Sequence, residues 1–109
     1  MSSYIQGQQL RNNGPVLVQV EFEVYGGVQG VNFTKYCKEM CGRFDLKGWT
    51  KLSPYGTVQG ILQGERANVD EMAMWLQHQG SPGSRIEHCE LRNWQILDKY
   101  DYRHFNVRF

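Results

Sequence analysis

A glycine-rich run, YGGVQGVNF at residues 25–33, has the composition of a loop that holds a small anion. Between a strand and a helix N-terminus, such a loop can aim several unpaired backbone N–H groups at one point, where the helix dipole also favours negative charge. No Asp or Glu occurs between Gly26 and Lys38, and the two charged residues there, Lys35 and Lys38, are positive. A glycine-rich connection that binds nothing is the more common reading of such a loop alone. The predicted phosphate-binding residues are Gly26, Gly27, Val28, Gln29, Gly30 and Val31.

The segments on either side of this run have the periodicities that the loop requires. Apolar residues occupy every second position of Val16–Tyr25, which predicts a half-buried strand. After the glycines, apolar residues recur every three to four positions. This spacing predicts a helix that begins near Val31 or Asn32 and ends between Phe44 and Lys47.

The middle of the chain predicts a hairpin followed by a second helix. Two strands, at residues 49–52 and 57–63, flank a turn with Pro54 at its second position. Asn68 followed by Glu71 resembles a capping box, so we expect the second helix to begin there.

The remaining strands complete a known topology. Residues 85–94 are strand-like, with a shift of apolar parity between Ile86 and Cys89 that predicts a bulge, and residues 105–109 alternate again. The order predicts an α+β protein with the ferredoxin-like split βαβ arrangement (βαββαβ). In it, two helices cover one face of an antiparallel sheet, to which a short fifth strand is added.

Length and charge narrow the classes of function. The 109 residues fit one domain, for which we predict a flexible N-terminal tail at 1–15 and a folded domain at 16–109. No apolar run approaches the roughly 20 residues that span a bilayer, and the N-terminus lacks the apolar segment of a signal peptide. We therefore expect a cytoplasmic protein, with a monomer as the default. A net charge of +1 without a basic block argues against nucleic-acid and membrane partners.

Cysteines and tryptophans are expected to serve packing. Cys37, Cys41 and Cys89 form no CxxC pair, which argues against a disulfide framework and a zinc site, so we expect reduced thiols. The residues expected at the interface of helices and sheet are Trp49, Trp75 and Trp94.

Two longer motifs carry a family resemblance. Residues 26–33 resemble the first signature of the acylphosphatase family, G-x-V-Q-G-V-x-F-R, up to its last position. Residues 48–58, GWTKLSPYGTV, resemble the second signature, G-W-x-K-N-x-x-x-G-x-V. Further likeness lies in SP-x-SRI at 81–86 and F-x-VRF at 105–109. The resemblance extends from about residue 16 to residue 109, and the family's ferredoxin-like fold agrees with the periodicity.

The resemblance implies hydrolysis of an acyl phosphate to carboxylate and inorganic phosphate, without a metal or organic cofactor. In that family the loop amides and the arginine that ends the first signature hold the phosphate, while the asparagine of the second signature orients the attacking water. Thr34 stands at the arginine position and Leu52 at the asparagine position, so no catalytic side chain matches. Phosphoryl transfer is catalysed mainly by positioning and charge stabilisation, so these replacements predict weak or lost activity.

The same residues are compatible with other functions. One alternative is a catalytically silent paralogue that binds phosphate, another anion or a protein partner. Lys35 is a candidate replacement cation, although one helical step rotates a side chain by about 100° away from the Thr34 direction. RNA binding through the sheet ranks last, because the chain is nearly neutral and has no aromatic-basic strand motif. His78, His88 and His104 lack the spacing of a metal site.

Overall fold

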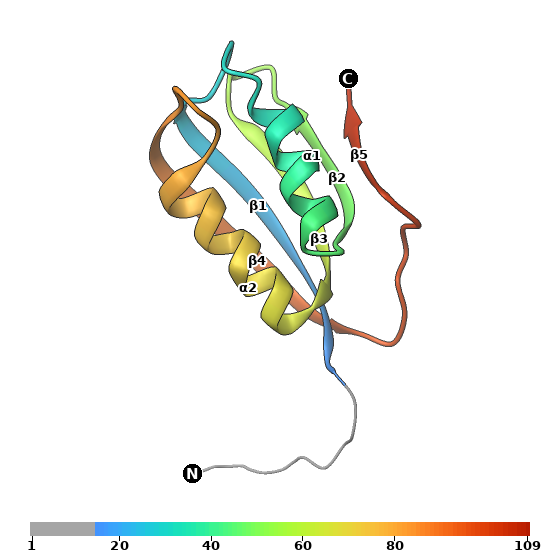
Figure 1. Cartoon of the computed structure of the whole chain (residues 1–109). Helices are drawn as coiled ribbons and strands as arrows, with labels where there is room; N and C mark the ends of the chain where they lie inside the picture. The colour runs from blue at the N-terminus through green and yellow to red at the C-terminus, as the bar shows by residue number, and fades with distance from the viewer. Residues whose placement is uncertain (1–14) are drawn as a thin grey trace, which may run out of the picture.

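The computed structural model describes residues 15–109, so most of the predicted tail at 1–15 lies outside the described residues. The elements follow in the order strand, helix, strand, strand, helix, strand, strand (Figure 1). Their bounds are β1 Leu17–Gly27, α1 Phe33–Arg43, β2 Lys47–Leu52, β3 Val58–Glu65, α2 Arg66–Met74, the π-helical turn η2 Trp75–Gln79, β4 Arg85–Leu97 and β5 Phe105–Arg108.

These elements form the predicted ferredoxin-like fold. The strands pair in the order β4-β1-β3-β2-β5, and both helices lie against one face of the sheet (Figure 1). Four strands pair antiparallel, whereas β5 runs parallel to β2, so the sheet is mixed. The fifth strand therefore adds an edge to the split βαβ core. Within the described chain, no helix combines the length and the apolar character needed to cross a membrane.

The core lies between the sheet and the two helices, as the alternation predicts. One face of β1 and one stripe of each helix supply most of it, with Cys37 and Cys41 fully buried on α1. The main contributors are Val18, Val20, Phe22, Val24, Phe33, Val69, Met72 and Leu76. Both ends of α1 are therefore fixed to the sheet, which holds its N-terminus at the end of β1.

The predicted start of α2 is wrong. The helix begins at Arg66, directly after β3, with Glu65 in an extended conformation at the N-cap and no side-chain capping hydrogen bond. Asn68 therefore lies inside the first turn and cannot cap it. Because β3 passes into the helix without a loop, the pairing of β3 fixes where the helix begins. Within the helix, the Arg66 Nε lies 3.1 Å from the Asp70 Oδ1 one turn later.

Two of the three tryptophans also depart from expectation. Trp75 is buried and lies against Phe33, with ring centroids 5.3 Å apart. Trp49 alternates with buried Thr50 and lies on the helix-free face, where the Arg108 guanidinium stacks 4.6 Å from its ring centroid. Trp94 is 42% exposed on the edge strand β4. Sheet parity and edge position therefore override the general preference of tryptophan for a core.

Candidate functional site

The glycine-rich run forms the connection between β1 and α1, as predicted. Val28 is buried and its amide donates a hydrogen bond of 2.9 Å to the Gly26 carbonyl. Within the described chain, the amides of residues 29–32 donate to no main-chain carbonyl. Gly30 (φ 71°) and Asn32 (φ 55°) adopt left-handed conformations, which turn the chain just before the helix. Successive free amides at a helix N-terminus are a suitable arrangement for an anion.

The start of the loop is fixed by the predicted bulge. Tyr25 pairs with His88 and Gly26 with Ile86, so Glu87 has no partner on β1. At this point Gly26 has a φ of 131°, and a Cβ on it would lie 2.1 Å from the Arg85 carbonyl oxygen. The β4 backbone therefore contacts the loop's first residue directly, and only glycine fits there.

The second motif, at residues 48–58, packs beside the glycine-rich loop. A Cβ on Gly56 would lie 2.4 Å from the Gln29 Nε2, so the Gln29 side chain covers Gly56 in the β2–β3 turn. The turn is closed by the Ser53 amide, which donates to the Thr57 carbonyl at 2.7 Å. The two motifs, which begin 22 residues apart at Gly26 and Gly48, thus meet at one end of the sheet.

The positions at which the resemblance places the catalytic side chains, Thr34 and Leu52, lie at this end. Thr34 is half-buried in the first turn of α1, directly after the loop, and Leu52 ends β2 with 48% of its surface exposed. Neither side chain carries a charge or an amide group. Lys35 is exposed on the next position of the helix. The Thr34 and Leu52 side chains therefore add neither a guanidinium nor an amide to the main-chain donors of the loop.

A buried carboxylate on the helix-free face was missed from the sequence. Glu23 is 8% exposed, accepts a hydrogen bond of 2.6 Å from the Thr57 hydroxyl and pairs with Arg92 at 3.1 Å. The Thr57 hydrogen bond, with help from Arg92 and Gln59, outweighs burial and lowers the Glu23 pKa from 4.5 to about 2. Thr57 belongs to the turn beside the loop, so the network ties that turn to β1 and β4. Cross-strand register brings these residues together, and no local pattern could have found them.

The network predicts an acid-dependent stability. Because the folded-state pKa of Glu23 lies below its ordinary value, its contribution is complete above pH 4.5 and is lost as the pH falls toward 2. We expect Glu23→Gln to reduce the free energy of unfolding at pH 7 by about 1–2 kcal/mol, since half-exposed Arg92 is screened. Urea unfolding at several pH values between 2 and 7 measures how the free energy of unfolding depends on pH in the parent and in Glu23→Gln. Exposed Glu71→Gln is the control, and an unchanged acid slope in Glu23→Gln would contradict the assignment.

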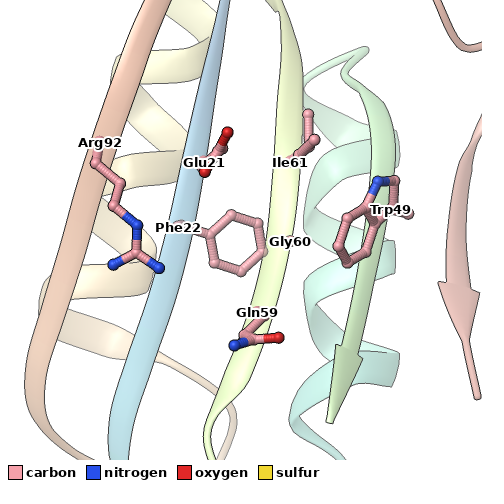
Figure 2. Close-up of a pocket in the computed structure, with 7 residues that line it drawn as sticks. All are labelled: Glu21, Phe22, Trp49, Gln59, Gly60, Ile61 and Arg92. Carbon is pink, nitrogen blue, oxygen red and sulfur yellow. The ribbon is translucent and has the colours of Figure 1, made fainter. Parts of the chain in front are cut away.

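A shallow hollow lies beside this network (Figure 2). Its volume is about 320 Å³, and Arg92, Glu21, Ile61 and Trp49 come from four adjacent strands. Gly60 lies at its floor, where a Cβ would lie 2.4 Å from the buried Phe22 ring, so that ring packs directly against the β3 backbone. The hollow lies over the sheet and not at the loop, so it is separate from the candidate site.

The remaining candidates do not converge on a site. His78 lies on η2, His88 on β4 and His104 before β5, and the described residues contain no group of three or more possible metal-binding side chains. Cys37 and Cys41 are free thiols, and burial raises the pKa of Cys41. The loop with Thr34 and Leu52 is therefore the candidate site.

Comparison with known proteins shows the family of this chain. The family model for acylphosphatase matches residues 20–107. Acylphosphatase-2 of Bos taurus is 38% identical over 98 residues, covering 90% of this chain and 99% of the bovine protein. Acylphosphatase-1 of Xenopus laevis is 42% identical over 90 residues, covering 83% and 91%. The solved acylphosphatase from Coxiella burnetii superposes with a TM-score of 0.74 at 29% identity, covering 85% of this chain and 94% of that one. The chain belongs to the acylphosphatase family.

Proposed function

We propose that this protein binds acyl phosphates through the loop at residues 26–31 and hydrolyses them slowly to carboxylate and phosphate. The observation that carries the proposal is the set of amides at residues 29–32, which donate to no main-chain carbonyl in the described chain and lie at a helix N-terminus. Family membership supplies the substrate class. We propose that no metal or organic cofactor takes part, and that the protein acts as a cytoplasmic monomer.

The proposed rate is low because two interactions are replaced. A guanidinium stabilises the charge that develops on the transferring phosphoryl group, and Thr34 supplies only a hydroxyl. An amide positions the attacking water, and the apolar side chain of Leu52 neither donates nor accepts. Ground-state binding by main-chain amides does not depend on either side chain. Binding should therefore be better retained than turnover.

Phosphate binding is tested on the loop amides. We expect inorganic phosphate to shift the ¹H–¹⁵N resonances of residues 29–32, and Gly30→Val to weaken binding at least tenfold. A Cβ at Gly30 meets nothing within 4 Å, but a β-branched residue is strained at a φ of 71°, so the variant keeps the fold and alters the loop. Equal affinity of Gly30→Val and the parent would contradict the assignment.

Lys35 is tested in the same titration. If Lys35 supplies the missing cation, Lys35→Ala weakens phosphate binding about fivefold to tenfold, and the loss disappears at high salt. We expect a change below twofold, because the exposed Lys35 side chain points one helical step away from Thr34. Lys99→Ala, at an exposed lysine after β4, is the matched control.

A catalytically silent paralogue is the second candidate, because both catalytic positions are replaced. Steady-state hydrolysis of benzoyl phosphate separates the two. A rate above that of buffer that falls in Gly30→Val supports slow hydrolysis, whereas a rate equal to buffer in the presence of phosphate binding supports the silent form. A protein partner would then be sought at the same loop.

A further inference from the structure

We propose that the groove between α1 and β5 binds an extended apolar acyl chain whose phosphate is held by the loop. The inference rests on the proposed function and adds a substrate class to it: phosphorylated carboxylic acids with a medium-length apolar chain. It is carried by the groove's lining, by its position beside the loop and by the charges on its rim.

The groove is long enough and apolar enough for such a chain. Its volume is about 520 Å³, within the roughly 300–1,000 Å³ of small-molecule sites. Val107 and the fully exposed Phe109 line one side, and α1 lines the other from Thr34 to Gly42. The eight steps from Thr34 to Gly42 correspond to about 12 Å along the helix. The wall is open at its far end because Gly42 has no side chain, and a Cβ there would meet nothing within 4 Å.

One end of the groove reaches Thr34, the position at which the family has arginine. Thr34 both lines the groove and follows the loop. Thr50 pairs with Val107 in the parallel register of β2 and β5, so Leu52 and Phe109 are the next residues along both strands on that same face. Where the family has arginine, this chain has the small residue Thr34, and where the family has asparagine, it has the exposed, apolar Leu52. The groove is therefore open toward the loop and apolar at that junction.

The rim favours an anionic, amphipathic ligand. Lys35 and Lys38 contribute to the lining, in which Glu39 is the one acidic side chain. Lysine packs its aliphatic stem along apolar surface while its ammonium group stays in water. The two lysines can thus flank an acyl chain with their aliphatic stems while their ammonium groups stay in water.

A series of alkylphosphonates tests the groove without turnover. Methyl-, butyl- and octylphosphonate carry the same dianionic head group, so the affinity difference between them reports the chain alone. We expect octylphosphonate, below its micelle concentration, to bind at least tenfold tighter than methylphosphonate in calorimetric titrations. Complete burial would strengthen binding roughly fourfold for each methylene added. The tenfold gain expected over the whole chain is much smaller, because the groove is open to solvent.

Gly42 offers a matched pair of variants. Gly42→Leu fills the far end, because a helical side chain leans toward the helix N-terminus and here meets free space. Gly42→Ala adds the same gain in helix propensity with little volume. We expect Gly42→Leu to bring the octyl affinity to within threefold of the methyl affinity, while Gly42→Ala retains the tenfold difference. Both variants should bind methylphosphonate as the parent does.

The outcomes separate this inference from the proposed function. Equal affinities for all three phosphonates would overturn the groove and leave phosphate binding by the loop intact. A chain-length gain that survives in Gly42→Leu would place the chain elsewhere and also overturn it. If no phosphonate and no inorganic phosphate binds, the proposed function itself fails, and the groove inference fails with it.

Discussion

Thr34→Arg combined with Leu52→Asn is expected to raise the rate of benzoyl phosphate hydrolysis at least about 100-fold over the parent protein. Removing one preorganised donor from a transition state costs about 10²–10³ in rate, and the gains are not additive because the two groups act on one reaction. The scaffold favours this gain, since the loop amides and the start of α1 are already in place. Steady-state release of inorganic phosphate measures it.

Each single variant should give only part of the gain. Thr34→Arg restores a cation at the end of the loop, whereas Leu52→Asn alone positions water against a phosphate that no guanidinium holds. Lys35→Arg is the matched control, because it adds a guanidinium on an exposed helical position about 100° around from Thr34. If the double variant binds phosphate and yet hydrolyses no faster than the parent, the loop has diverged from a catalytic geometry.

The loop was predictable because its signals are local. A period of two before the glycines and a period near three and a half after them define a strand and a helix, and Gly26 and Gly30 do adopt the left-handed conformations that glycine permits. The bulge at Glu87 was predictable for the same reason, because it shifts the apolar parity of β4. These features need no knowledge of which distant segments meet.

Other features depend on which segments meet. The apolar stripe predicted α2, but β3 runs straight into it, so the helix begins before the apparent capping residue Asn68. The orientation of Trp49 follows from the register of β2, which hydrophobicity alone does not reveal. Glu23 reads as an ordinary outward-facing residue until Thr57 and Arg92 are placed beside it by cross-strand pairing. The groove likewise exists only because β5 returns parallel to β2, along α1.

Gly26→Ala is expected to destabilise the protein by about 3 kcal/mol or more, a large part of the 5–15 kcal/mol that stabilises a typical domain. A Cβ on Gly26 would lie 2.1 Å from the Arg85 carbonyl oxygen and 2.8 Å from the Glu87 amide nitrogen, both in the backbone of β4. The φ of 131° adds strain for any side chain. Relief requires β4 to move away from β1, which breaks the bulge that fixes the loop.

Gly27→Ala provides the comparison, because the two glycines are neighbours on the same strand. A Cβ on Gly27 would make only ordinary contact, 3.5 Å from the Arg85 Cβ, and its φ lies outside the left-handed region. We expect a change within about 0.5 kcal/mol in urea unfolding at 25 °C. Phosphate titration of any folded Gly26→Ala protein should show weaker binding than that of Gly27→Ala, since only the former displaces the start of the loop. Equal stability and equal phosphate affinity for the two variants would mean that the β4 backbone does not set the loop's geometry.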